Sequence, residues 1–216
     1  MMPEFDFREM INRMIGEKAR KYAELNTLVQ KGQVLLAGSS LMENFPVNEI
    51  MMSAGDTRVV YNRGIGGAVI EQYDQHLKEC VLDLEPRKLF INIGSNDLNL
   101  PGDTIGNMIR KYKALLDRIM TALPECDITV LAFYPVRPAE EAGHAEDGRI
   151  VRTKELVNEA NKALEEMASD LGLKFLNLNG PLVDEEGYMR EEISTDQIHF
   201  SPAGYFPVYD QLKDLF

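Results

Sequence analysis

Short apolar runs alternate along the chain with longer stretches in which apolar residues recur every three or four positions. The first long stretch, from Phe7 to Val29, predicts an amphipathic helix that ends near Gly32. Five apolar runs predict strands, at residues 34–37, 58–61, 88–93, 128–133 and 174–178. Helical periodicity predicts further helices at residues 69–81, 105–119, 156–167 and 203–216. Strands and helices therefore alternate.

This alternation predicts the fold class. Strands that are apolar on both faces are typical of a parallel sheet, because right-handed crossovers cover both faces with helices. We expect an α/β protein with a flavodoxin-like, three-layer α/β/α sandwich around a five-stranded parallel sheet. No internal repeat or Pro- and Ser-rich linker divides the chain, so residues 1–216 are expected to form a single domain with an N-terminal amphipathic helix.

Charge and composition narrow the classes of partner. The chain carries 23 basic and 35 acidic side chains, a net charge of -12, which repels nucleic-acid phosphates and anionic lipid head groups. Cys80 and Cys126 lack a C-x-x-C spacing, so we expect both to be buried as small hydrophobic residues. The scarcity of cysteine also indicates a protein of a reducing compartment. Charges interrupt the apolar start of the chain, and no apolar run approaches the about 18 residues that cross a bilayer. We expect a cytoplasmic protein with no nucleic-acid partner and no stable membrane insertion.

Polar residues and glycines follow the predicted strands. Ser40 follows the first strand, the glycine-rich segment 62–67 follows the second, and Asn96 follows the third; Asp196 and His199 stand near the end of the chain. Open parallel sheets bind ligands at the carboxyl ends of their strands. These residues supply a hydroxyl nucleophile, backbone N–H donors, an amide and an Asp/His pair, which are the groups that acyl transfer requires.

In four blocks the sequence resembles the SGNH, or GDSL, hydrolases, which are named for a Ser, a Gly, an Asn and a His. The blocks are Ala-Gly-Ser-Ser-Leu at 37–41, Asn-Arg-Gly-Ile-Gly-Gly at 62–67, Gly-Ser-Asn-Asp at 94–97, and Asp196 to Tyr205. They occur in the family's order, each after the appropriate element. The second block is most similar to the platelet-activating-factor acetylhydrolase-like and lysophospholipase-like branches.

The resemblance implies a role for each of five residues. Ser40 would be the nucleophile, His199 the general base and Asp196 the carboxylate that holds the imidazole. The oxyanion hole would use the backbone N–H groups of Ser40 and Gly67 and the side-chain amide of Asn96. The activity implied is a serine esterase or acylhydrolase that forms an acyl-enzyme from lipid-type or short acyl esters.

One position departs from the family pattern, and two other functions stay open. Ser39 stands where the family usually has Asp, so any hydrogen bond or field from that carboxylate is in doubt. A carbohydrate O-deacetylase would use the same site. A catalytically inert flavodoxin-like binding or scaffold subunit is the alternative of another class, although the complete set of site residues counts against it.

The remaining candidates are assigned no chemistry. His76 lies in a helical pattern, and His144 lies in a long loop, 135–148, which we expect to border the substrate. The carboxylates lack the spacing of a metal site, so no metal and no cofactor is expected. The expected partner is a small-molecule ester. The N-terminal helix either covers the sheet or forms a dimer contact, which leaves a homo-oligomer open.

Overall fold

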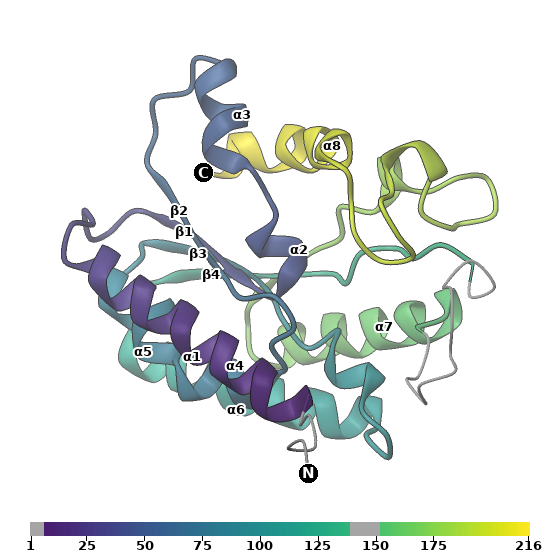
Figure 1. The fold of residues 1–216 in the computed structure, drawn as a ribbon, viewed down its shortest axis with the longest axis horizontal. Coiled ribbons are helices and arrows are strands. Elements are labelled where there is room, and N and C mark those ends of the chain that lie inside the picture. Colours follow the sequence, from purple (N-terminus) through teal and green to yellow (C-terminus); the bar gives the residue numbers. More distant parts are fainter. Residues whose placement is uncertain (1–6, 139–151) are drawn as a thin grey trace, which may run out of the picture.

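The computed structural model describes residues 7–138 and 152–216 (Figure 1). Its sheet has five strands in the order β2-β1-β3-β4-β5, and every neighbouring pair is parallel. The strands are β1 (Val34–Gly38), β2 (Val60–Gly64), β3 (Lys88–Asn92), β4 (Asp127–Leu131) and β5 (Lys174–Leu176). The predicted five-stranded parallel sheet is confirmed.

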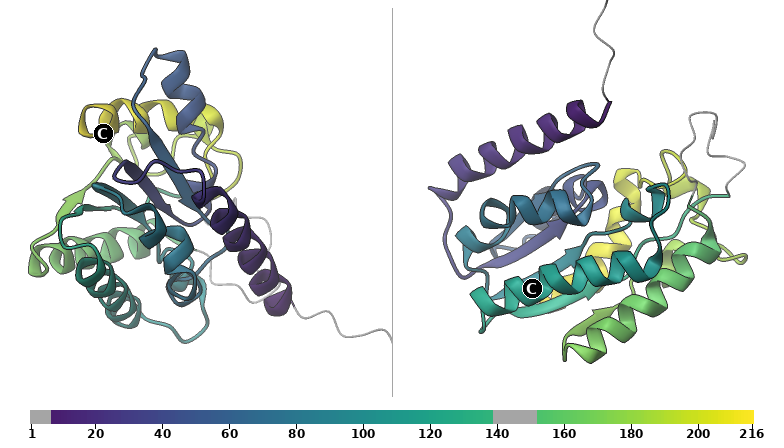
Figure 2. Two further views of the ribbon diagram at one scale, coloured as in Figure 1. Left: turned by 90° about the vertical axis from the view of Figure 1, so that its left-hand side faces the viewer. Right: turned by 90° about the horizontal axis from the view of Figure 1, so that it is seen from below.

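Helices cover both faces of the sheet (Figures 1 and 2). One face packs against α1 (Phe7–Asn26), α4 (Ile70–Gln75), α5 (Leu77–Cys80), α6 (Ile105–Ala122) and α7 (Lys154–Asp170). The other packs against α2 (Ser40–Glu43), α3 (Val47–Ser53) and α8 (Pro202–Leu212). Single 3-10 turns lie at Leu82–Leu84, Asp97–Asn99, Gly180–Leu182, Glu191–Ile193 and Lys213–Leu215. The three-layer α/β/α architecture is therefore as predicted.

The core consists of two clusters because side chains alternate between the faces of a strand. In β1, Leu35 and Ala37 belong to the cluster under α1 and α4 to α7, whereas Val34 and Leu36 belong to the cluster under α2, α3 and α8. All four side chains are fully buried. A strand buried on both faces explains why the sequence shows an unbroken apolar run there rather than an alternation.

The N-terminal helix covers the core. Its residues Ile15 and Tyr22 are buried in the first cluster, and the Tyr22 hydroxyl donates to the Gly64 carbonyl at the end of β2 (2.5 Å). The sequence left open whether this helix covers the sheet or forms a dimer contact, and in the structure α1 packs on the core at one face of the sheet.

Several predicted elements have different limits in the structure, among them the following two. The expected helix at 69–81 is interrupted at His76, whose φ of -114° and ψ of 20° leave the helical region, and it continues as α5. The second strand runs to Gly64 rather than ending at Tyr61. The polar Arg63 hides this extension in the sequence, but its guanidinium is buried over the Tyr22 ring (4.9 Å).

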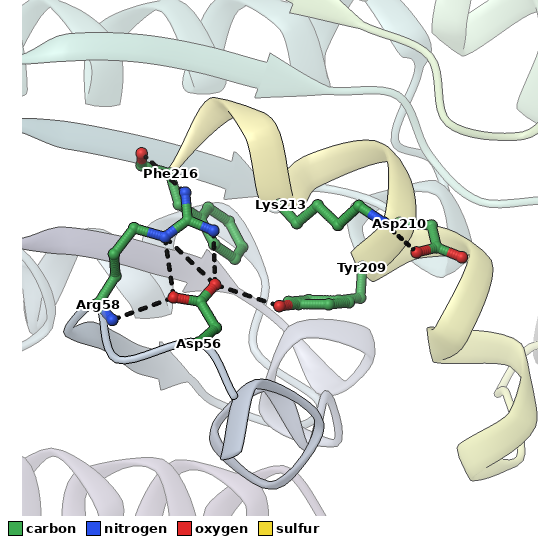
Figure 3. Close-up of polar contacts among 6 residues, drawn as sticks. All are labelled: Asp56, Arg58, Tyr209, Asp210, Lys213 and Phe216. Carbon is green, nitrogen blue, oxygen red and sulfur yellow. Dashed lines mark hydrogen bonds and ion pairs between the residues drawn. The ribbon is translucent and has the colours of Figure 1, made fainter. Parts of the chain in front are cut away.

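A group of contacts around Phe216 holds the segment after α8 against the sheet (Figure 3). The Phe216 ring packs edge-on against Phe90 of β3 (5.8 Å between centroids), and the Arg58 guanidinium lies over it at 5.7 Å. Asp56 accepts hydrogen bonds from the Arg58 side chain and from the Tyr209 hydroxyl (3.2 Å). Asp56 thus links α8 to the segment that leads into β2.

Replacement of Asp56 by Asn should lower the free energy of unfolding at pH 7 by about 1 kcal/mol, because it breaks a charge-assisted pair that is only partly exposed. The hydrogen bond from Arg58 holds the pKa of Asp56 well below its usual value. Its contribution is therefore present above the unfolded-state pKa of about 4 and declines below it.

Urea unfolding of wild type and D56N at pH 7 and at pH 3 tests this expectation. Asp210, whose pair with Lys213 is exposed, supplies the control D210N (Figure 3). Equal losses in D56N and D210N, or a D56N loss that grows towards pH 3, would contradict the assignment.

Candidate active site

Ser40 stands at the first position of α2, two residues beyond β1. The turn between them needs glycine at position 38: its φ is 151°, and a Cβ there would lie 2.0 Å from the Asn92 carbonyl oxygen of β3. Ser39, where the resembled family usually has Asp, is buried, and its N–H donates to the same Asn92 oxygen (3.1 Å). The main chain therefore sets the position of Ser40.

Side chains from two distant segments hold α2 in place. Asn62 of β2 donates from Nδ2 to the Met42 carbonyl (2.5 Å) and accepts from the Gly64 N–H (2.9 Å). The Tyr205 hydroxyl of α8 donates to the Leu41 carbonyl (2.9 Å). Carbonyls at the end of a helix lack partners within it, so these bonds satisfy groups that α2 leaves open.

Asp196 and His199 lie in one tight turn that precedes α8. The turn is closed by an antiparallel bridge between Ser194 and Phe200. Asp196 Oδ1 accepts from the N–H groups of Ile198 (2.8 Å) and His199 (2.7 Å), while its Oδ2 lies 2.7 Å from His199 Nδ1. The turn thus orients the carboxylate towards the imidazole.

The other ring nitrogen of His199 meets Ser40. The distance from Ser40 Oγ to His199 Nε2 is 2.8 Å, although 159 positions separate the two residues in the chain. Partial burial raises the pKa of Asp196, but its hydrogen bonds from His199 and from two backbone N–H groups outweigh that effect and lower the pKa. The carboxylate is consequently ionised at neutral pH, beside an imidazole that contacts a hydroxyl.

Backbone donors gather next to this contact. In the described part of the chain, neither the Ser40 N–H nor the Gly67 N–H has a hydrogen-bond acceptor. A Cβ on Gly66 would lie 3.7 Å from Ser40 Cβ, so the glycine turn reaches the serine. Asn96 Nδ2 donates to the Ala68 carbonyl (3.0 Å), and an amide nitrogen carries a second hydrogen. The three groups expected to bind an oxyanion lie in this neighbourhood.

Glu43 is a residue of this neighbourhood that the sequence interpretation missed. Its Oε2 accepts from the Gly66 N–H (2.5 Å), and its Oε1 pairs with Lys18 of α1 (2.8 Å). The signal was its spacing, since a residue three positions after Ser40 lies on the same face of a helix. Glu43 holds the glycine turn against the helix that carries Ser40.

Asp97, the last residue of the third family-like block, is fully buried. Its Oδ2 accepts from the Ile70 N–H at the start of α4 (3.0 Å), and its Oδ1 lies 3.7 Å from Lys111 Nζ. Burial raises the pKa of this carboxyl to about 6. Through the bond from Ile70, Asp97 connects the start of α4, three residues after Gly67, to the segment that carries Asn96.

Two other histidines and one loop were weighed from the sequence. His76 lies at the break between α4 and α5. His144 and most of the 135–148 loop fall outside the described residues, but the loop begins next to the histidine turn, where the Arg137 N–H donates to the Gln197 carbonyl (2.8 Å). Within residues 7–138 and 152–216, no three His, Cys, Asp or Glu side chains are grouped as metal ligands would be. No helix in these ranges has the length and apolar character to span a membrane.

Comparison with known proteins identifies the family. The model of the GDSL-like lipase/acylhydrolase family matches residues 47–205, well over half of the chain. The chain belongs to this family. It is therefore a GDSL-type carboxylic ester hydrolase. A search of curated proteins finds no significant match.

Solved structures of this family share the SGNH hydrolase fold. A Streptococcus pneumoniae protein, provisionally described as a platelet activating factor, is 26% identical, with a TM-score of 0.84 over 96% of this chain and 95% of its own. A GDSL-like lipase from Bacteroides thetaiotaomicron is 19% identical, with a TM-score of 0.74 over 91% and 96%. A catalytic mutant of an acetylxylan esterase from Geobacillus stearothermophilus is 14% identical, with a TM-score of 0.62 over 87% and 95%. The last two likenesses concern the fold alone.

The buried Asp97 predicts a measurable pH dependence of stability. Its folded pKa of about 6 lies above the unfolded value of about 4, so its protonated form favours the folded state at pH 4, and this stabilisation is lost as pH rises to 6. Asp97→Asn, which mimics the neutral acid, should match wild type near pH 4. By pH 7 it should be more stable by as much as about 2–3 kcal/mol, because wild type then buries a charge.

Urea unfolding of wild type and D97N between pH 4 and 8 measures this difference. Asp103 supplies a matched control, because it pairs with the same Lys111 (2.8 Å) and its pKa is lowered. Burial raises the pKa of Asp103, but the hydrogen bonds from Lys111, Thr104 and Asn107, together with the Lys111 charge, outweigh that effect. D103N should therefore be less stable than wild type by a nearly constant amount above about pH 5, because Asp103 is ionised in both the folded and the unfolded state there. Parallel curves for the two variants would refute this account of Asp97.

Proposed function

We propose that this chain hydrolyses carboxylic esters through a covalent acyl-enzyme formed on Ser40. The observation that carries the proposal is the continuous contact from Ser40 Oγ to His199 Nε2 (2.8 Å) and from His199 Nδ1 to Asp196 Oδ2 (2.7 Å). A serine hydroxyl becomes an effective nucleophile when an adjacent imidazole accepts its proton, and the imidazole works best when a carboxylate holds its orientation.

Each step can be assigned to atoms of the site. Ser40 Oγ attacks the ester carbonyl carbon while its proton passes to His199 Nε2, and the carbonyl oxygen becomes an oxyanion. As the tetrahedral intermediate collapses, the bond to the alcohol oxygen breaks, and that oxygen takes the proton from Nε2. Water then attacks the acyl-enzyme by the same route and releases the acid and Ser40. The ionised Asp196 stabilises the imidazolium in both halves.

The oxyanion would be stabilised by the N–H groups of Ser40 and Gly67 and by Nδ2 of Asn96. Donors that are already oriented before the reaction stabilise the transition state at little reorganisation cost. The absence of an acceptor for either N–H in the described residues supports this assignment. Protein groups make every proton transfer in the scheme, so it includes no cofactor and no metal.

Short acyl esters are the substrates we favour. The support is the Streptococcus pneumoniae relative, which matches nearly the whole chain at 26% identity and carries the name of an acetylated phospholipid, platelet activating factor. Acetylated sugars are the second substrate class to test. They rank second because the acetylxylan esterase shares only the fold with this chain, at 14% identity. A panel of acetyl, butyryl and octanoyl esters of p-nitrophenol, run beside acetylated xylose, separates these classes.

Ser40→Ala should abolish ester hydrolysis and labelling by a fluorophosphonate probe, since it removes the attacking oxygen. Ser39→Ala is the matched control, because it deletes a neighbouring hydroxyl whose residue is buried and whose backbone contacts remain. It should keep measurable activity. A fully active S40A enzyme, or equal losses in both variants, would show that the nucleophile is another residue. An unlabelled, inactive wild type would favour the inert binding subunit.

Activity should rise with pH as the His199 imidazole loses its proton. The rise follows because only the neutral form of His199 can accept the Ser40 proton. Rates for wild type and His76→Ala between pH 5 and 9 should show the same limb, and His199→Ala should lose it together with most activity. If the limb disappears in H76A, His76 rather than His199 is the general base.

A further inference from the structure

Arg152 is a buried cation beside the proposed oxyanion site. Only 5% of the residue is exposed, and in the described part of the chain no ion pair includes it. A buried charge is costly unless hydrogen bonds or an opposite charge compensate for it. Burial lowers the pKa of Arg152 to about 10, against the opposing influence of Asp196, so the guanidinium stays charged at neutral pH.

The guanidinium is compensated by amide oxygens. Nη2 donates to Asn96 Oδ1 and Nε donates to Asn99 Oδ1, each at 3.2 Å. The Arg152 carbonyl accepts from Gln197 Nε2 (3.1 Å), in the same turn as Asp196 and His199. Arg152 therefore contacts both the segment that carries Asn96 and the turn that carries the imidazole.

The contact determines which way the Asn96 amide points. A guanidinium can only donate hydrogen bonds, so the atom of Asn96 that faces Arg152 must be the oxygen. The amide nitrogen is then turned to the other side, where it donates to Ala68, the residue after Gly67. Without the cation, a flipped amide would present its oxygen to the substrate and repel a developing oxyanion.

The contact also strengthens the donor. A hydrogen bond from a cation to an amide oxygen draws electron density away from the N–H groups of that amide, and linked bonds in a low-dielectric interior reinforce one another. The charge itself lies one side chain behind the place where negative charge would develop. Both effects act only when the carbonyl oxygen becomes charged, so they would accelerate the reaction rather than tighten substrate binding.

We propose that Arg152 is a positioning residue of the oxyanion hole, which holds Asn96 with Nδ2 towards the reacting carbonyl and strengthens it as a donor. This inference rests on the proposed esterase function. It assigns Arg152 a role in turnover through Asn96 and no contact with the substrate.

The test is a double-mutant cycle of Arg152→Met and Asn96→Ala, with kcat and KM measured on p-nitrophenyl acetate. Loss of one oxyanion donor typically lowers kcat by about 100- to 1000-fold, which is the expectation for N96A. R152M should lower kcat by about 10- to 100-fold with KM nearly unchanged, because it weakens that same donor. In the N96A background R152M should lower kcat by less than about threefold, since the residue through which it acts is gone.

Arg63 provides the matched control. It is exposed to the same 5% and donates from Nε and Nη2 to an asparagine oxygen, Asn26 Oδ1 (3.2 and 3.0 Å), on α1. If Arg63→Met changes kcat, the fold-change should be the same in wild type and in N96A, because the two residues act independently. Arg152→Lys should give an intermediate kcat, because an ammonium keeps the charge but lacks the fork that reaches both asparagines. If circular dichroism shows that R152M is unfolded, R152K takes its place in the cycle.

The outcomes separate this inference from the proposed function. If hydrolysis requires Ser40 but R152M lowers kcat equally in both backgrounds, the positioning role is refuted while the esterase stands. A rise in KM at constant kcat would instead make Arg152 a substrate-binding residue and also overturn the proposal. If wild type and S40A hydrolyse the ester equally, the esterase mechanism fails, and the role of Arg152 fails with it.

Discussion

The position of Ser40 depends on a backbone contact between neighbouring strands. At Gly38 the end of β1 lies so close to β3 that a Cβ would stand 2.0 Å from the Asn92 carbonyl oxygen. At Gly64 the end of β2 lies equally close to α2, where a Cβ would stand 2.2 Å from the Glu43 nitrogen. Helix α2 thus lies where the ends of β1, β2 and β3 meet, and a side chain at position 38 or 64 would have no room. Main-chain atoms therefore fix the backbone of Ser40, including its N–H, with Ser39 in the place where the family usually has Asp.

Around this rigid centre, charged groups differ in their surroundings and consequently in their state. Asp196 is half exposed and receives three hydrogen bonds, which keep it ionised. Asp97 is buried with a more distant cation, and its pKa lies near 6. Arg152 is buried among amides and stays charged. Polar groups that support one site can thus differ in the pH at which they ionise, because burial and hydrogen bonding act locally.

Much of the fold could be predicted from the sequence because its signals are local. Apolar runs and helical periodicity indicated the sheet and its covering helices, and the four blocks indicated which residues would meet at the strand ends. The failures have physical causes. Residues 40–43 form a single helical turn, too short for any periodicity, and Arg63 concealed the end of β2 because its burial depends on Tyr22, 41 positions earlier. Arg152 and Asp97 could not be recognised because a buried charge and an exposed one look alike in a sequence, and their partners lie in distant segments.

The separation of Ser40 and His199 by 159 positions has a consequence for how the chain becomes active. The serine belongs to the first strand-to-helix turn, whereas the histidine arrives only when the last helix docks and Tyr205 reaches the Leu41 carbonyl. Contacts between such remote segments require the largest loss of chain entropy and form slowly. On the proposed mechanism, a chain that has built its sheet but has not yet docked α8 would hold the Ser40 hydroxyl and the backbone donors without the general base. Ester hydrolysis by that mechanism would then report the completion of folding, and an assay during refolding would follow the docking of α8 rather than the formation of secondary structure.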